Sequence, residues 1–137
     1  MNEPSGNLRL CSLELRLRTA DLALAAHSGP LWRSGLGLAL SRHFPGVFPL
    51  LFGPQASLGR LYALYPAFEA VRPRDHFILH ISLFGSACDH AVACTQAIAQ
   101  LGEIGLGQAR GKYQLISARV FEQPVFASSE QGLIAWP

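Results

Sequence analysis

The sequence has few charged residues and no long apolar run. Only 15% of its 137 residues are charged, below the roughly one-quarter that is usual for a globular domain. No stretch approaches the roughly 18 consecutive apolar residues of a membrane-spanning helix. The opening MNEPSGNLRL lacks the basic and apolar regions of a signal peptide. These absences predict a cytoplasmic protein without a membrane segment.

Cysteine is also scarce, with three residues, Cys11, Cys88 and Cys94, and no CxxC spacing. Such a pattern excludes a disulfide framework or a zinc knuckle and predicts reduced thiols. The densest group of potential metal ligands is His76, His80, Cys88 and His90. Zinc sites are better marked by ligand pairs two to four residues apart on tight turns. We therefore predict neither a metal site nor a cofactor.

Lysine is nearly absent, because the basic residues are ten arginines and one lysine, Lys112. The net charge of +2 and the pI near 8.6 lie below the pI above about 9 that is typical of dedicated nucleic-acid-binding domains. Arginine suits phosphates and stacks on bases, but a GC-rich genome produces the same bias. Charge alone therefore does not predict an RNA-binding protein.

The length corresponds to one domain with a continuous core. Half of the residues are hydrophobic, which leaves more apolar surface than one small domain needs. We expect part of this surface to contact another domain or subunit, either a second domain, a second copy in a homodimer, or other subunits of a complex.

Three segments have the features of β-strands. Residues 8–17 alternate apolar and polar residues, and a change of phase near Cys11 and Ser12 predicts a β-bulge. Residues 76–84 alternate more strictly, with an apolar face and a mixed face that could meet solvent or ligand. Residues 61–68 are a weaker strand that Pro66 restricts to a sheet edge.

Two helices are expected between and after these strands. Residues 31–43 are rich in Leu and Ala, and Gly35 and Gly37 indicate close packing of the helix backbone. Residues 90–104 place apolar side chains three and four apart, with Asp89 as the amino-terminal cap. Residues 44–59 are predicted to be a loop because of their prolines and glycines.

A glycine-rich turn over residues 102–111 leads into a last predicted strand over 112–121. The order is then β-α-β-β-α-β, which is typical of the α+β ferredoxin-like fold, a four-stranded antiparallel sheet with two helices on one face. We assign residues 1–123 to this domain. Residues 124–137 lose periodicity and are predicted to be a linker or tail toward a missing second domain.

Three motifs in this order resemble the amino-terminal half of the CRISPR-associated RAMP-superfamily pre-crRNA processing endoribonucleases. They are SGPLWRSGLGLALSR, FPLLFGP and HFILHISLFGSACDHAVACTQAIAQLGEIGLGQARGKYQL. Arg33 and Gly37 match the first family motif, whereas Ser34 stands where the family usually has Gly. The cysteines that often precede the second motif are absent. The resemblance covers roughly residues 8–121 and implies a further RAMP-like domain that this chain lacks.

By this resemblance the chain is an RNA-binding domain of a pre-crRNA endoribonuclease, whose partner is CRISPR repeat RNA or crRNA. Cleavage in the family proceeds without metal through attack of the 2′-hydroxyl, and we expect it to require the second domain. An alternative is a non-catalytic RAMP subunit that binds crRNA or protein partners in an effector complex. A third is an unrelated ferredoxin-like small-ligand binder or enzyme that uses His76 and His80 over the open sheet.

The last family motif contains the candidate RNA-binding loop. Its residues are Gly105, Gly107, Arg110, Gly111 and Lys112. The loop follows a helix and precedes a strand, the reverse of the order in dinucleotide-binding sites. One interpretation is a backbone loop close to RNA phosphates with Arg110 and Lys112 supplying charge, and the other is a plain turn whose glycines adopt positive φ.

The resemblance also points to the first helix. Arg33 is a candidate RNA-binding residue, and His43 stands near the place where several relatives have a catalytic histidine. Imidazole suits proton transfer because its pKa lies near neutral. The alternative role of His43 is contact with the carbonyls at the helix end. His27, in the loop before the helix, is a second catalytic candidate.

Overall fold

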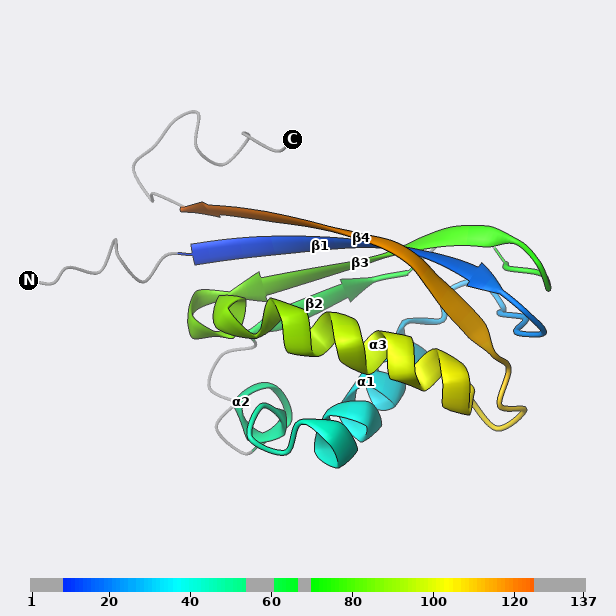
Figure 1. Ribbon diagram of the computed structural model, residues 1–137, viewed down its shortest axis with the longest axis horizontal. Helices are drawn as coiled ribbons and strands as arrows, with labels where there is room; N and C mark the ends of the chain where they lie inside the picture. Colours follow the sequence, from blue (N-terminus) through cyan, green and yellow to red (C-terminus); the bar gives the residue numbers. More distant parts are fainter. Residues whose placement is uncertain (1–8, 54–60, 67–69, 125–137) are drawn as a thin grey trace, which may run out of the picture.

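The structure, a computed structural model, describes residues 9–53, 61–66 and 70–124 (Figure 1). The strands are β1 (Arg9–Thr19), β2 (Tyr62–Tyr65), β3 (His76–Phe84) and β4 (Tyr113–Pro124). The helices are α1 (Gly29–His43), α2 (Phe48–Phe52), a 3-10 helix η3 (Gly85–His90) and α3 (Ala91–Ile104). The tail predicted over 124–137 lies, after Pro124, outside the described residues.

All strands join in one antiparallel sheet in the order β2-β3-β1-β4. Helices α1 and α3 cover one face of it, and the opposite face is open (Figure 1). The prediction of an α+β ferredoxin-like fold is confirmed. The predicted edge strand is β2, which ends at Tyr65 directly before Pro66, and residues 67 and 68 of the prediction lie outside the described part. No described helix is long and apolar enough to cross a membrane.

The core lies between the sheet and the two long helices. Every second residue of β1 from Cys11 to Leu17 is fully buried, as are Leu79, Ile81 and Leu83 of β3. Trp32 of α1 is fully buried between the rings of Phe77, 6.0 Å away, and Tyr113, 5.4 Å away. The alternation in β1 and β3 therefore reflects one apolar face that the helices cover.

Close packing of α1 depends on its glycines, as the sequence predicts. A Cβ atom at Gly35 would lie 2.6 Å from Leu101 of α3, and one at Gly37 would lie 3.2 Å from the ring of Phe52. The described part of the segment 44–59, residues 44–53, is not only a loop, which corrects our prediction; residues 54–59 lie outside the described residues. Its residues 48–52 form α2, whose Leu51 is buried and whose Phe48 and Phe52 rings stack at 5.5 Å.

The bulge predicted near Cys11 and Ser12 is wrong. Cys11 continues the buried face of β1, and the apolar Leu10 that suggested a phase change lies on the open face opposite Phe84. The irregularity instead lies in β4, where Ile116 is skipped between the pairs of Arg16 with Ser117 and of Leu17 with Leu115. A bulge at this point moves the remainder of β4 by one residue.

Asp89 is not the cap of α3, because His90 occupies that position and Asp89 belongs to η3. The Asp89 carboxylate instead accepts a hydrogen bond from Arg9 at 2.7 Å, which holds the pKa of this carboxyl below its usual range. The six residues of η3 separate β3 from α3. Our prediction left residues 85–89 between the strand and the helix without an assignment and missed this element.

Burial of Cys94 predicts an alkaline dependence of stability. Desolvation, with a smaller contribution from Cys11, raises the pKa of the Cys94 thiol from 9.0 to about 12. Because the pKa of this thiol is raised in the folded state, the contribution of the protonated Cys94 to the free energy of unfolding is complete below pH 9. This contribution is lost as the pH rises toward 12. The difference in free energy of unfolding between the wild type and Cys94→Ala should then shrink above pH 9 by about 1.4 kcal/mol per pH unit. Urea unfolding at several pH values measures it, with the constant difference below pH 9 as internal control. A difference that stays constant above pH 9 would contradict the burial of this thiol.

Candidate functional site

The glycine-rich segment is a tight loop closed by its own backbone. Leu106 and Gly111 exchange hydrogen bonds of 2.8 and 3.2 Å, and the Arg110 N–H donates to the Gly107 carbonyl at 3.1 Å. Gly105 has φ 111° and Gly107 has φ 78°, conformations that glycine adopts without steric cost. At Gly111 an added Cβ would lie 2.7 Å from the backbone of Leu22. The glycines therefore have structural reasons for their positions.

This loop forms one wall of a groove of about 490 Å³ between α1 and α3. The α1 wall consists of Leu31, Ser34, Gly35, Leu38 and Arg42. The opposite wall is formed by Leu101, Ile104 and Leu106 together with the loop residues Gly105, Gly107, Gln108 and Arg110. The groove is thus mainly apolar, with an arginine on each wall.

The two arginines give the groove its charge. Arg42 comes from the last turn of α1, and Arg110 from the loop; both are exposed. Arg110 has φ 53°, a left-handed conformation that is uncommon outside glycine and is found mainly at turns and functional sites. Guanidinium groups bind phosphate oxygens in paired hydrogen bonds. The groove can therefore hold an anionic ligand that also has a flat or apolar part.

Of the predicted RNA-binding residues, Arg110, Gly105 and Gly107 line this groove. Gly111, Lys112 and Arg33 do not. The backbone N–H of Lys112 donates to the Asp21 carboxylate at 2.6 Å, which fixes the end of the loop. Arg33 lines a separate groove of about 510 Å³ between α1 and α2. The structure does not bring Arg33 and Arg110 into one site.

The two histidine candidates lie at opposite ends of α1. His27 precedes the helix with φ 63°, and His43 is its last residue; both are exposed. The 15 residues of α1 span about 22 Å at the helical rise, so both imidazoles cannot act on one phosphate. His43 follows Arg42 in sequence, but of these two residues only Arg42 lines the groove.

Arg42 is the groove residue that our site prediction missed. The sequence contains the signal, because Leu31, Gly35, Leu38 and Arg42 are spaced by three and four and so share one face of a helix. Our prediction named Arg33 of this helix, which lies nine residues before Arg42 and therefore on a different side. What the sequence lacks is the knowledge that the distant loop packs on the side of Arg42.

The histidines of β3 do not join a metal cluster. His76 and His80 are exposed on the open face of the sheet, whereas Cys88 is buried. Across residues 9–53, 61–66 and 70–124, no group of three or more His, Cys, Asp or Glu is placed to hold a metal ion.

Comparison with known proteins gives a family and a fold. The AF_1859_N family, described as an N-terminal domain, matches residues 55–135. No curated protein shows a significant sequence match. A chain of the Csm3-Csm4 subcomplex in the type III-A CRISPR-Cas interference complex is similar with a TM-score of 0.62 and 13% identity, over 85% of this chain and 81% of that one. A Cas6 product complex is similar with a TM-score of 0.50 and 17% identity, over 82% of this chain and 39% of that one. The resemblance to RAMP-type proteins is confirmed at the level of the fold.

The geometry of the loop predicts that Gly105 is required for stability. A Cβ atom there would collide with the carbonyl of Arg110, in addition to the strain of a positive φ. We expect Gly105→Ala to lower the free energy of unfolding by about 1–3 kcal/mol, measured by urea denaturation. Gly46→Ala is the matched control, because nothing lies within 4 Å of a Cβ at Gly46. Equal stabilities of the two variants would show that the loop is not built as described.

Proposed function

Because the chain belongs to the AF_1859_N family and has a RAMP-type fold, we propose that it is an RNA-binding domain of a CRISPR ribonucleoprotein. The observation that carries the proposal is the groove between α1, α3 and the glycine-rich loop, with Arg42 and Arg110 on its two walls. Both similar structures named above come from CRISPR proteins.

RNA suits this groove better than a small anion does. Its two arginines are exposed at the rim, where phosphates of a backbone would pass, while Leu38 and Ile104, 46% and 38% exposed, offer apolar surface for a ribose or base. Protein contacts to RNA combine phosphate contacts with stacking or apolar contacts to unpaired bases. A small anion would use only the guanidinium groups and leave the apolar wall without a partner.

In its finer form, the proposal is that the chain is the amino-terminal half of a pre-crRNA endoribonuclease. His43, the last residue of α1 and the neighbour in sequence of the groove residue Arg42, would take the proton of a ribose 2′-hydroxyl. The 2′-oxygen attacks the adjacent phosphorus, the bond to the 5′-oxygen breaks, and a 2′,3′-cyclic phosphate remains. The leaving 5′-oxygen needs a proton donor, which we assign to the second RAMP-like domain. His27, at the other end of α1, is the alternative base.

The second candidate is a non-catalytic RAMP subunit that binds crRNA or protein partners of an effector complex. This chain covers 81% of the chain from the Csm3-Csm4 subcomplex but only 39% of the Cas6 chain. A second copy in a homodimer, or another RAMP subunit, would then complete the RNA site.

The groove predicts which arginines bind RNA. The double variant Arg42→Ala/Arg110→Asn should bind RNA hairpins about 10-fold more weakly, and the slope of log affinity against log salt should flatten by about 1 to 2, because fewer counterions are released. Asn tolerates the left-handed backbone of position 110. Filter binding at several salt concentrations measures both. Arg72→Ala removes an exposed charge outside the groove and is the control. If the double variant binds RNA like the control, the groove is not the RNA site. If the wild type does not bind RNA, the result supports the unrelated small-ligand binder.

Cleavage separates the two candidate functions. For an endoribonuclease, His43→Ala should leave RNA affinity nearly unchanged and abolish cleavage, since a proton-transfer residue acts in the transition state. His27→Ala should leave both unchanged. Denaturing gels of end-labelled repeat RNA, run with EDTA present and with phosphatase-resistant ends as the mark of cyclic phosphate, provide the test. The wild type is assayed together with the second RAMP-like domain, because that domain is assigned the proton donor. RNA binding with no cleavage under these conditions would select the non-catalytic subunit.

A further inference from the structure

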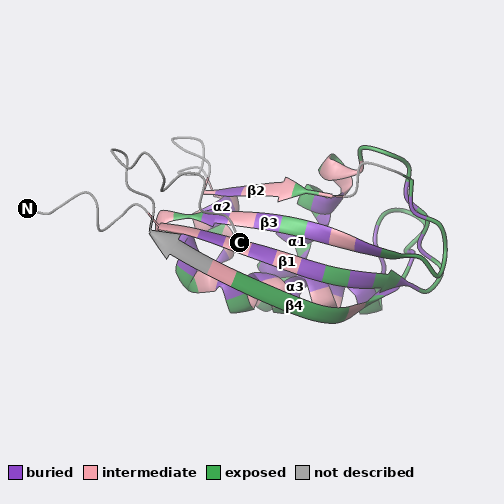
Figure 2. Cartoon of the chain, turned by 90° about the horizontal axis from the view of Figure 1, so that it is seen from above, coloured by how far each residue is buried: buried purple, intermediate pink, exposed green. Residues whose placement is uncertain are grey.

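The face of the sheet opposite the helices has a chemical composition of its own. Figure 2 views the molecule from this side and shows exposed residues alternating with buried ones along β1 and β3. Pairing in the sheet defines which side chains share the open face, because directly opposed residues point to the same side. Glu14 pairs with His80 and with Arg119, and His80 also pairs with Tyr65. These side chains form one row across all four strands.

Aromatic rings lie in and beside this row. Tyr65 of β2 is 52% exposed and Phe84 of β3 is 37% exposed. Phe121 of β4 is half-buried and pairs with Ser12 on the same face. Tyr65 pairs with His80, and Phe84 follows His80 by four positions, which is about 13 Å along β3. The rings are therefore too far apart to share one flat ligand but could each receive a separate one.

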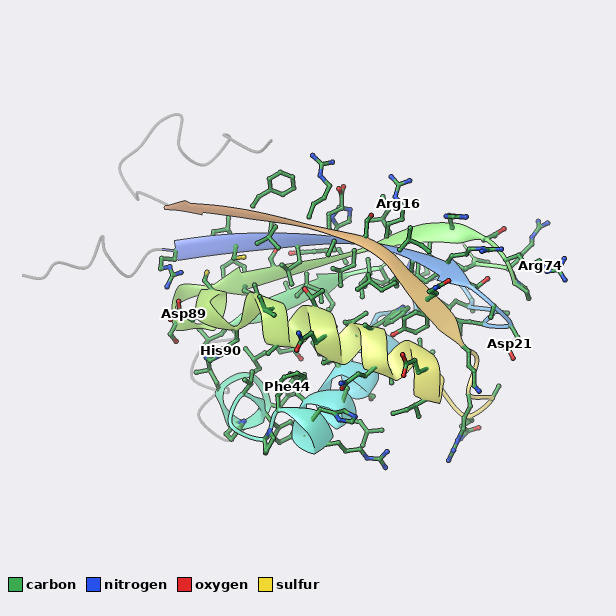
Figure 3. All side chains as sticks on the ribbon, viewed as in Figure 1. Arg16, Asp21, Phe44, Arg74, Asp89 and His90 are labelled. Atoms are coloured by element: carbon green, nitrogen blue, oxygen red, sulfur yellow. The ribbon has the colours of Figure 1, made fainter. Side chains whose placement is uncertain are left out.

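Arginines occupy the other end of the open face. Arg16 and Arg18 of β1 are exposed and follow the row by two and four residues. Figure 3 shows Arg16 standing above the sheet on the side away from the helices, and Arg74 at the end of the molecule. Arg18, Arg74 and Gln114 line a hollow of about 330 Å³ at this end. Glu14 is the single carboxylate among the described side chains that the pairing places on the open face.

Arg119 contacts both an aromatic ring and the carboxylate of the open face. Its guanidinium lies 5.0 Å from the centre of the Phe121 ring and is held by the Glu14 carboxylate at 3.3 Å. The side chain is nevertheless 66% exposed. An arginine fixed in this way presents its plane to solvent, and such planes stack on bases as aromatic rings do.

We propose that the open face binds a single-stranded segment of RNA that crosses the sheet from β2 to β4. Unpaired bases stack on Tyr65, on Phe84 and on the pair of Arg119 with Phe121. The phosphates lie toward Arg16 and Arg18, with Arg74 at the end. The inference rests on the proposed function, because it assigns a second contact for the same RNA on the side of the domain away from the groove.

Charge and pattern favour RNA over a protein on this face. Interfaces that pair protein domains have an apolar centre from which charged residues are depleted. Here a carboxylate, an arginine and a histidine, the residues Glu14, Arg119 and His80, stand in the central row. A second copy of the chain would bring the same excess of arginine to the contact. Rings interspersed with arginines are the arrangement that binds single strands of any sequence.

The test uses the full chain and a short oligouridylate, which has no secondary structure. Tyr65→Ala and Phe84→Ala should each weaken oligouridylate binding about 10-fold, because each removes a ring on which a base stacks. Tyr65→Trp should bind like the wild type, and the fluorescence of the added tryptophan should be quenched by a stacked base. Val92→Trp is the matched control, since Val92 is 67% exposed on α3 away from this face; its fluorescence should not change. Circular dichroism and urea unfolding establish that the variants are folded.

The outcomes separate this inference from the proposed function. Loss of oligouridylate binding in Tyr65→Ala, with hairpin binding still dependent on Arg42 and Arg110, supports both. Unchanged oligouridylate affinity in Tyr65→Ala and no quenching in Tyr65→Trp would overturn the stacking surface and leave the groove intact. The stacking surface is also overturned if sedimentation shows that Tyr65→Ala dissociates a dimer without changing RNA binding. The open face would then be the contact between two copies of the chain. The stacking surface is likewise rejected if RNA binding is lost only in the Arg42→Ala/Arg110→Asn variant.

Discussion

The hydroxyl of Tyr113 donates a hydrogen bond of 2.6 Å to the Ile98 carbonyl of α3, and its ring packs 5.4 Å from Trp32 of α1. One side chain at the start of β4 thus ties both helices to the sheet at the point where the glycine-rich loop ends. The hydroxyl is buried, which raises its pKa above the ordinary value and keeps it a neutral donor. Both helices that form the groove therefore contact Tyr113, α3 through this hydrogen bond and α1 through Trp32. A polar bond in a dry core is costly to break.

The end of the loop is tied to the sheet as well. Ala20 and Leu22 donate backbone hydrogen bonds to the Lys112 carbonyl, while Asp21 accepts one from the Lys112 N–H. Arg18, two residues before Ala20, lines the hollow at the end of the open face. The loop wall of the groove and the basic end of the sheet are thereby neighbours around one edge of the domain. The RNA that we propose as ligand could therefore contact both faces of the domain around this edge.

Periodicity predicted the elements whose burial is regular and missed those set by contacts distant in sequence. The strand at residues 76–84 and helix α3 follow from their spacing, because each has one face in the core. Helix α1 follows from its Leu and Ala content. The short helix α2 escaped prediction because Pro49 and the apolar FPLLF have no period, and its place is decided by packing against Gly37. The bulge was wrongly predicted because of Leu10, since a half-buried leucine on the open face cannot be distinguished in sequence from one in the core. Of the site, the loop was predictable from its glycines, whereas the role of Arg42 depends on which side of α1 that loop covers.

The bulge at Ile116 decides what β4 offers to each side. Tyr113 points into the core, and a regular strand would carry residues 115, 117, 119 and 121 to the same side. The extra residue reverses the order, so that Arg119 and Phe121 emerge beside Glu14 and Ser12 on the open face. Removing one residue here would turn both side chains toward the helices without changing either of them. Insertion or loss of a single codon at this point can therefore change in one step which side chains of β4 lie on the open face. Substitutions alone would need many changes to reach the same surface.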